Sequence, residues 1–393
     1  MRNFLLLFIT SIAFGQSVTK SIRLLPDTGQ TTSYTATFGE DNDYTINAPS
    51  FTDNSNGTIT DNVTGLMWQQ VDGGEMTIEN APNYCSSLTL GGYTDWRLPT
   101  PIESFSILNL QRNNPAMNTT YFPSSGADYW WTNTFQMNDN TKVWCTNAGG
   151  GIGNKPKLET ISAGGNKSYH VRAVRDSTVP TTLANHYTDN GDGTVTDNLT
   201  QLVWQKVPTT TALTWEQALS YAEGLTLAGV SDWRLPNIKE LQSLNDEGAM
   251  NPSVNTTYFS AIGVKNYWSS TTLLPNPSNL TSAWYWNTQF GITTYDTKTN
   301  TNYVICVRGI PTNLAVNNFD LKSKIKVYPN PFSSKVIIEN VEENETYKLY
   351  NEIGQQFFSG KNIEKEDFSS LSKGVYFLEI NGKTNSKIKL IKE

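Results

Sequence analysis

The chain is short of the residues from which most metal sites and active sites are built. Its 393 residues include only three cysteines and two histidines. The cysteines, at positions 85, 145 and 306, form no CxxC pair, which argues against a structural zinc site. In an oxidising compartment, the simplest arrangement for three cysteines is one disulfide and one remaining thiol.

Charge and long apolar runs are also scarce. Charged residues make up 17% of the chain, the formal net charge is −7, and no segment is strongly basic. The chain therefore lacks the electrostatic signature of a nucleic-acid-binding protein. No apolar run reaches the roughly 20 residues of a transmembrane helix. Asn, Thr, Ser and Gly take the place of charged residues, which is typical of β-rich extracellular modules with many turns.

The N-terminus has the features of an export signal. Arg2 is followed by an almost entirely apolar stretch over residues 4–14, and small residues stand at Ala13 and Gly15. This order of a basic residue, a short apolar region and a small-residue cleavage site predicts a signal peptide over residues 1–15. A buried N-terminal helix is the alternative interpretation.

The remainder of the chain contains an internal duplication. Residues 51–70 reappear as 187–206 with 12 of the 20 positions identical by direct comparison. The motif WRLP, the segment NPxxNTTYF and a closing strand that contains VR follow in both copies in the same order. A repeat this long indicates two tandem globular domains rather than a solenoid.

Each copy predicts an α+β module. Asn-Gly and Thr-Gly turn signals separate short β-type runs at the start of the copy. Two helix starts follow, at Thr77 and Thr100 in the first copy and at Thr214 and Asn237 in the second. The second half is rich in strands and loops. We expect an N-terminal spacer over 16–50 and domains over 51–176 and 187–309.

The C-terminal part differs in character from the two copies. Residues 310–320 form a polar linker, and residues 321–393 contain no Trp, many Lys and Glu, and alternating runs such as 335–339, 347–350 and 374–380. Short strands separated by turns predict a small all-β sandwich.

The two copies resemble the C-terminal domain family of the collagen-like adhesin Lcl. The resemblance rests on GTxTDNxTGLxWQ, on WRLP followed by a capped helix with Glu, on YW and on the closing VR strand. It implies a C-type-lectin-like fold and an adhesin that binds glycans. The EPN or QPD and WND signatures of calcium-dependent lectins are absent.

The last segment resembles the C-terminal sorting domain of the type IX secretion system. YPNPF at 328–332, LYNEIGQ at 349–355, LSKGVYFLEI at 371–380 and the basic end carry the match. The resemblance implies that residues 321–393 engage the type IX machinery and direct passage across the outer membrane.

The WRLP motif also offers an enzymatic interpretation. WRLP before a capped helix also occurs in formylglycine-generating enzymes, which share the lectin-like fold but need a reactive cysteine pair close in sequence. Here Cys145 stands alone. We therefore interpret Asp95-Trp96-Arg97 and its second copy as structural, with the arginine paired and the tryptophan packed.

Two Asp-rich loops are calcium candidates. Asp53 in the first copy, and Asp189 and Asp192 in the second, could offer carboxylate oxygens. Asn-Gly and Asp-Gly also form hairpin turns, and the spacing of an EF-hand loop is missing. The turn interpretation is therefore favoured, and calcium stays the alternative.

Aromatic residues not shared between the copies are the ligand candidates. They fall in the loop-rich half, which forms the ligand surface in lectin-like folds, and an exposed ring beside an amide suits a sugar. The candidate ligand residues are Tyr285, Trp286, Asn287, Gln289, Tyr295, Trp131 and Asn147. Strand alternation favours Tyr285 and Asn287, because the shared Trp284 points inward.

A disulfide between Cys85 and Cys145 is predicted, since Cys306 aligns with Ala173 and has no equivalent in the first copy. Within the family, the bond would instead join Cys85 to the closing strand.

Together these features predict a secreted or outer-membrane surface protein of a Gram-negative bacterium. We expect it to be non-catalytic and to bind an extracellular glycan or matrix polymer. An enzyme of formylglycine-generating-enzyme-like fold and a ligand-free structural component are the alternatives. We expect no nucleic-acid partner, no transmembrane segment and no cofactor other than the calcium alternative.

Overall fold

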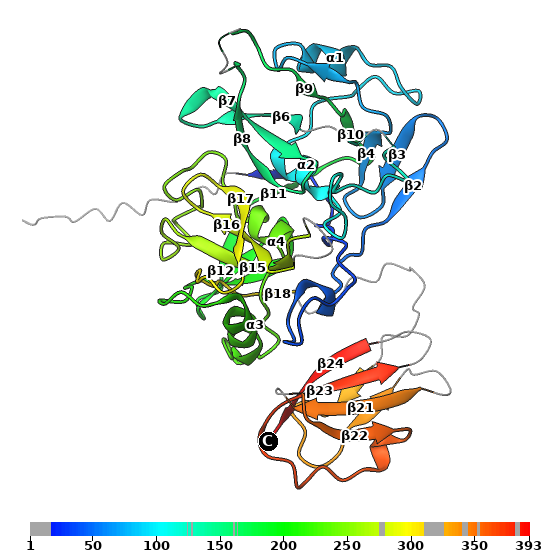
Figure 1. Cartoon of the computed structure of the whole chain (residues 1–393), viewed down its shortest axis with the longest axis vertical. Helices are drawn as coiled ribbons and strands as arrows, with labels where there is room; N and C mark the ends of the chain where they lie inside the picture. Colours follow the sequence, from blue (N-terminus) through cyan, green and yellow to red (C-terminus); the bar gives the residue numbers. More distant parts are fainter. Residues whose placement is uncertain are drawn as a thin grey trace, which may run out of the picture.

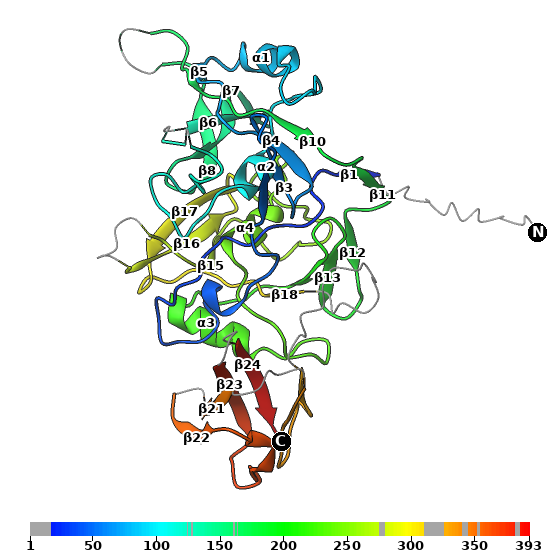
Figure 2. The ribbon, with the colours of Figure 1, turned by 90° about the vertical axis from the view of Figure 1, so that its right-hand side faces the viewer.

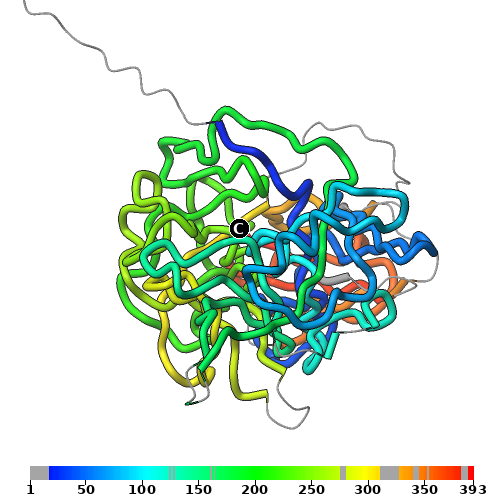
Figure 3. Tube along the Cα trace, turned by 90° about the horizontal axis from the view of Figure 1, so that it is seen from above, coloured from blue at the N-terminus to red at the C-terminus, as the bar shows by residue number. Residues whose placement is uncertain are grey.

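The computed structural model arranges three units along one long axis. It describes residues 17–123, 125–126, 129–159, 162, 164–274, 280–309, 326–339, 345–351, 354–381 and 386–393. The expected signal peptide and the linker at 310–320 lie outside these ranges. Repeat 1 (51–176) and repeat 2 (187–309) adjoin each other, and the C-terminal domain lies at the end nearer repeat 2 (Figures 1 and 2). Figure 3 looks down this axis, along which the units overlie one another.

Each repeat contains two short helices and two antiparallel or mixed sheets. The sheets of repeat 1 have the orders β10-β4-β3-β2 and β5-β9-β6-β7-β8, and those of repeat 2 have the orders β12-β13-β14-β18 and β15-β16-β17. The elements of repeat 1 are β2 (Phe51–Asp53), β3 (Thr58–Asp61), β4 (Leu66–Gln69), β5 (Glu75–Met76), α1 (Ala81–Ser87), α2 (Pro101–Ser106), β6 (Tyr129–Gln136), β7 (Asp139–Asn147), β8 (Ile152–Pro156), β9 (Tyr169–His170) and β10 (Val174–Asp176). Those of repeat 2 are β12 (Tyr187–Asp189), β13 (Thr194–Asp197), β14 (Leu202–Gln205), α3 (Trp215–Gly224), α4 (Ile238–Ser243), β15 (Asn266–Thr272), β16 (Ser282–Asn287), β17 (Ile292–Thr297) and β18 (Val307–Gly309).

Helix caps confirm three of the four predicted helix starts. Thr100, Thr214 and Asn237 each accept a hydrogen bond from the N3 backbone in a complete capping box. The start predicted at Thr77 is wrong, because α1 begins only at Ala81. The residue three positions after Thr77 is Asn80 rather than Glu or Gln, so the reciprocal half of a capping box is missing.

The two repeats are packed against each other through equivalent elements. Strand β8 contacts β17, and helix α2 contacts α4. Ile152 donates its backbone N–H to Thr293 Oγ1 over 2.9 Å, and a Cβ built on Gly151 would lie 3.5 Å from Trp284. Contact between equivalent surfaces is the geometry of an isologous dimer, here within one chain. We call this contact the repeat interface.

One apolar core extends across the repeat interface. The largest cluster of buried side chains includes Trp68 and Trp144 of repeat 1 together with Trp204, Trp284 and Trp286 of repeat 2. Each repeat also keeps a smaller cluster of its own. The two predicted tandem domains therefore share their main core.

The N-terminal segment (residues 17–50) is not the spacer predicted from sequence. Its first strand, β1 (Val18–Lys20), pairs with β11 (Thr181–Leu183) between the repeats, and η1 (Asp41–Asp43) follows. Figure 2 shows it as a dark blue trace beside both repeats. Gln30 Nε2 donates to the carbonyls of Leu110 and Thr272, one in each repeat, over 3.1 and 2.7 Å. The segment thus bridges the repeats.

A buried lysine joins the same three parts. Lys239 of α4 is fully buried, and its Nζ donates to the carbonyls of Asp27 and Ser106 over 2.9 and 2.8 Å. Burial lowers the pKa of Lys239 to about 8, although the carboxylates of Asp27, Asp61 and Asp41 oppose the shift. Its ammonium group therefore links the N-terminal segment to both repeats.

The C-terminal domain is all β apart from the short η2 (Ile363–Lys365). The pair β19 (Lys326–Tyr328) and β20 (Ile337–Glu339) faces a four-stranded sheet of order β22-β21-β23-β24. That sheet contains β21 (Thr346–Asn351), β22 (Gln356–Gly360), β23 (Gly374–Asn381) and β24 (Ser386–Lys392). Ile338 from the first sheet and Leu349 and Leu378 from the second share one apolar cluster, as in a small sandwich.

Across the described part of the chain, no helix is both long and apolar enough to cross a membrane.

Packing at the repeat interface predicts a large effect for Trp284→Ala. Trp284 is buried in the shared core, so truncation should lower the free energy of unfolding by about 3–5 kcal/mol. Tyr295→Ala is the matched control, because its exposed ring only touches Trp284 edge-on and should cost less than about 1 kcal/mol. Urea unfolding measures both, and equal small losses would contradict a shared core.

The Lys239 contacts predict that Lys239→Met destabilises the fold by about 2–6 kcal/mol, since it leaves the buried carbonyls of Asp27 and Ser106 without their donor. Lys206→Met is the control. Its ammonium pairs with Asp189 on an exposed hairpin, so the expected loss is below about 1 kcal/mol. Thermal or urea unfolding measures the stability of both variants. If Lys239→Met is as stable as the parent chain, Lys239 does not stabilise the contact between the three parts.

Candidate functional site

The Asp-Trp-Arg motifs form a structural frame in both repeats. Arg234 makes a bidentate ion pair with Glu240 of α4, with both N–O distances 2.6 Å. Asp232 pairs with Arg308 of the closing strand over 2.6 Å, and Trp233 donates its indole N–H to the carbonyl of Leu227.

Repeat 1 contains the same contacts, formed by Arg97 with Glu103, Asp95 with Arg175 and Trp96 with Leu90. The structural interpretation of the motif is confirmed, so these side chains are already engaged in contacts within the fold.

The predicted ligand stretch in β16 is largely occupied by folding contacts. Trp286 is fully buried in the shared core, so it cannot meet a ligand. The amide of Asn287 donates to Asn266 over 2.8 Å, and its Oδ1 accepts from the backbone of Gln289 and Phe290. Asn287 thus shapes the turn that follows β16. The assignment of Trp286 as a ligand contact needs correction, and Asn287 stays a prediction.

The remaining candidates in repeat 2 do not form one site. Tyr285 is half-buried and packs edge-on against Trp268, whereas Tyr295 is 57% exposed and contacts Trp284. Tyr285 pairs with Thr294 and Trp284 with Tyr295, so the two tyrosines lie on opposite faces of the sheet. Gln289 is exposed in the turn. Tyr295 and Gln289 are therefore the exposed candidates, and Tyr285 is partly accessible on the other face.

In repeat 1, Trp131 and Asn147 also serve the fold. Trp131 is fully buried and donates its indole N–H to the carbonyl of Met76 over 2.8 Å, as Trp268 does to Leu213 over 2.9 Å. Trp131 is thus the counterpart of Trp268. The sequence alignment had given that place to the neighbouring Trp130, so it wrongly treated Trp131 as unshared.

Asn147 Oδ1 accepts from the backbone N–H groups of Gly149 and Gly151 and closes the turn before β8. It is therefore a turn residue rather than a ligand contact.

The Asp-rich loops are hairpin turns whose carboxylates are engaged. Asp53 accepts from the backbone of Ser55, and Asp189 from that of Gly191 and from Lys206. Asp192 accepts from the backbone and hydroxyl of Thr194. Among the described residues, no group of three or more His, Cys, Asp or Glu side chains could hold a metal ion.

The predicted disulfide is not formed. Cys85, Cys145 and Cys306 are all free and buried. Cys85 and Cys145 do lie in one apolar cluster of repeat 1, so placing them together was right while the bond was wrong. Cys145 instead donates its Sγ–H to the carbonyl of Val143 over 3.4 Å. Burial raises the pKa of Cys85 to about 12, which leaves the thiol unreactive.

Free buried thiols predict slow modification of the folded protein. A thiol reagent at pH 8 should label none of the three cysteines in native conditions and all three in denaturant, because only the exposed thiolate reacts. Quantitative labelling without reductant measures this. If only one thiol is labelled after denaturation instead of three, the other two cysteines are joined in a disulfide, and the free thiols described here are contradicted.

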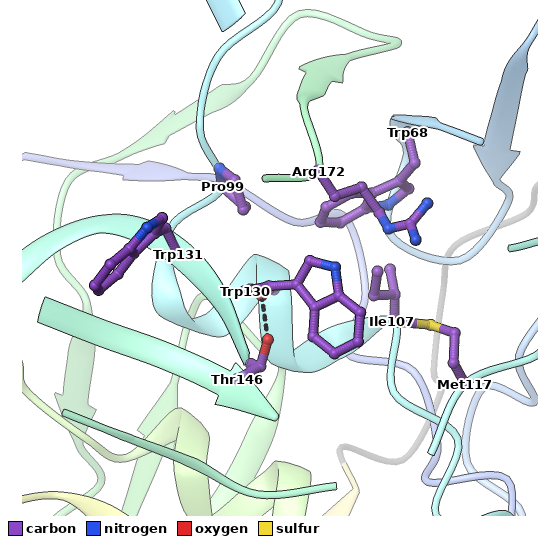
Figure 4. A pocket seen from close by; sticks show the side chains of 9 residues that line it. Trp68, Pro99, Ile107, Met117, Trp130, Trp131, Thr146 and Arg172 are labelled. Carbon is purple, nitrogen blue, oxygen red and sulfur yellow. Dashed lines mark hydrogen bonds between the residues drawn. The ribbon is translucent and has the colours of Figure 1, made fainter. Parts of the chain in front are cut away.

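The cavities in the described part of the chain include the following three. The first lies between Trp68, Trp130, Trp131 and Arg172 in repeat 1 (Figure 4). Its volume of about 10 Å³ has room for about one water molecule. A second, of about 150 Å³, lies between the N-terminal segment and residues 176–181.

The third cavity, of about 120 Å³, opens where the N-terminal segment meets α2 and α4. We call it the interface pocket. The described residues that line it are Lys20, Ser21, Ile22, Ile102, His186, Asp197, Leu199, Thr200, Gln242, Ser243, Asn245 and Glu247. Sequence reasoning missed it because its residues come from distant parts of the chain.

The fold and its engaged motifs define a β-rich tandem unit followed by a separate β domain. The Lcl C-terminal domain model matches residues 57–175 and 193–308, and the secretion system C-terminal sorting domain model matches residues 326–393. The chain therefore belongs to the Lcl C-terminal domain family and carries a type IX sorting domain. It is a secreted or cell-surface protein of Bacteroidetes-type bacteria.

No curated protein matches the chain. A solved structure with some similarity is PorZ of Porphyromonas gingivalis, described as an essential bacterial surface component of the type-IX secretion system. It is 14% identical, and the match covers 64% of this chain and 29% of PorZ. At a TM-score of 0.17, a shared fold does not follow from this match.

Proposed function

We propose that the protein is a non-catalytic surface adhesin whose tandem Lcl-type unit, of C-type-lectin-like fold, binds an extracellular glycan or matrix polymer. The observation that carries this proposal is the pair of Lcl C-terminal domain matches joined to a sorting domain in one chain. The first would supply the binding module, and the second supplies the route to the cell surface.

The state of the thiols supports a binding role over the enzymatic alternative. An enzyme of the formylglycine-generating type needs a reactive cysteine pair, whereas Cys85 and Cys145 are buried and have raised pKa values because of that burial. The Arg-Glu and Asp-Arg pairs of the WRLP frame are engaged in holding helices and closing strands.

The sorting domain predicts how the protein is exported. Deleting residues 321–393 should leave the chain in the periplasm, because the C-terminal domain would carry the signal for outer-membrane passage. Cell fractionation and surface labelling measure the distribution. The control is a chain with Tyr295→Ala in repeat 2, which should reach the surface like the parent. Surface delivery of the truncated chain would contradict the sorting role.

Ligand binding is tested on arrays of glycans and matrix proteins with the purified full chain. We expect retention on a defined subset of glycans, with loss after heat unfolding. A folded chain that binds nothing on either array would instead be a ligand-free structural component of the surface. Turnover of an arrayed substrate would favour the enzymatic alternative.

A further inference from the structure

The interface pocket is built by both repeats and by the N-terminal segment. Ile102 comes from α2 of repeat 1, Gln242 from α4 of repeat 2, and Lys20 from strand β1. His186 stands in the linker immediately before β12. A cavity assembled from four separate parts of the chain exists only when the repeats are packed together.

Three residues that line this pocket have a buried side-chain atom that makes no hydrogen bond. Gln242 is 2% exposed and Asn245 is 8% exposed, and the side-chain oxygen of each is buried with no hydrogen-bond partner among the described residues. His186 Nε2 is also buried without a hydrogen bond, 3.4 Å from Asp197 Oδ1. Each such atom costs about 1–3 kcal/mol. A donor-bearing occupant that reaches the side-chain oxygens of Gln242 and Asn245 would satisfy them.

The charges that line the pocket select against an anionic occupant. Asp197 and Glu247 face a single lysine, Lys20, and no arginine is among the described lining residues. A sulfate or phosphate group would meet these carboxylates without the paired basic side chains that usually bind such groups. A neutral molecule rich in hydroxyl groups fits better, because hydroxyls both donate to the free oxygens and accept from the ammonium group.

The size and the apolar surface of the interface pocket further restrict the class of ligand that fits it. About 120 Å³ would hold several water molecules but is below the roughly 300–1,000 Å³ of sites for drug-sized ligands. Ile22, Ile102 and Leu199 give the pocket an apolar wall beside its polar groups. One sugar ring presents both kinds of surface, with C–H groups on its faces and hydroxyls around its edge.

We propose that the interface pocket binds one neutral sugar residue of an extracellular glycan. This inference rests on the proposed function and names its site and ligand class. It requires both repeats to form one site between them, so the duplication serves to build a pocket rather than to supply two independent binding domains.

The test uses the purified full chain with four neutral monosaccharides as probes, namely glucose, galactose, mannose and N-acetylglucosamine. Ligand-observed NMR and calorimetry measure binding. Asn245→Leu removes a free buried oxygen at nearly constant volume. We expect at least a tenfold loss of affinity for the sugar that binds. The melting temperature should fall only slightly, because the replaced oxygen has no partner and the variant gives up only the hydrogen bond from Asn245 Nδ2 to Glu247 Oε1, at 3.4 Å.

Two further variants distinguish binding in the interface pocket from binding on the outer surface of repeat 2. Ser243→Phe places a ring in the pocket while giving up only a hydrogen bond to the carbonyl of Glu240, and it should abolish binding. Tyr295→Ala removes the exposed aromatic ring of repeat 2 outside the pocket lining and should leave affinity unchanged. Melting curves confirm that each variant folds.

The outcomes distinguish this inference from the proposed function. If the chain binds glycans on the array, and the folded variants Asn245→Leu and Ser243→Phe keep full affinity, the sugar site in the interface pocket is wrong. The proposed adhesin function then still stands. The same holds if the chain binds glycans on the array but none of the four neutral probes, which would mean that the pocket contains only water. Absence of any binding, on arrays and in solution, overturns both.

Discussion

The packing of one repeat against the other through equivalent faces constrains the rest of the molecule. It buries Trp284 and Trp286, which would otherwise lie on the loop-rich half of an isolated domain. Part of the loop-rich half of each repeat is thereby used for intramolecular contact. What remains accessible is the outer edge of that half and the pocket that the contact itself creates.

The N-terminal segment and the buried charges depend on the same contact. Asp41 Oδ2 accepts hydrogen bonds from Thr28 of the segment and Thr271 of repeat 2. Burial raises the pKa of Asp41 well above its usual value, and the nearby Asp27 adds to the shift. Such groups are tolerated inside a protein only where geometry supplies partners. The bridging segment therefore helps to fix how the repeats are oriented.

Local features of the fold were predictable from the sequence, and long-range ones were not. Thr214 with Gln217 is a capping box that can be read from four consecutive residues, and the duplication placed the Asp-Trp-Arg frame in both repeats. The role of the N-terminal segment was invisible because Gln30 finds its partners 80 and 242 positions away. No local pattern encodes such a contact.

The prediction of ligand residues from the sequence was incomplete for related reasons. Strand alternation correctly predicted that Trp284 points inward. The other repeat covers the same face of the strand, so Trp286 is buried as well. Trp131 was misjudged because two adjacent tryptophans allow an alignment error of one residue, which reverses the face of a strand. Cys85 and Cys145 were correctly predicted to lie together, but in their apolar cluster they are free thiols and form no disulfide.

The bridging N-terminal segment also sets the order in which the molecule can mature. Its hydrogen bonds to Thr271 and Thr272 join residues separated by more than two hundred positions. Contacts this distant slow folding, because a long loop must close before they form. The segment leaves the ribosome before both repeats and forms these contacts only after repeat 2 has been made. A chain interrupted before repeat 2 is complete therefore keeps an open apolar face that is vulnerable to aggregation and proteolysis.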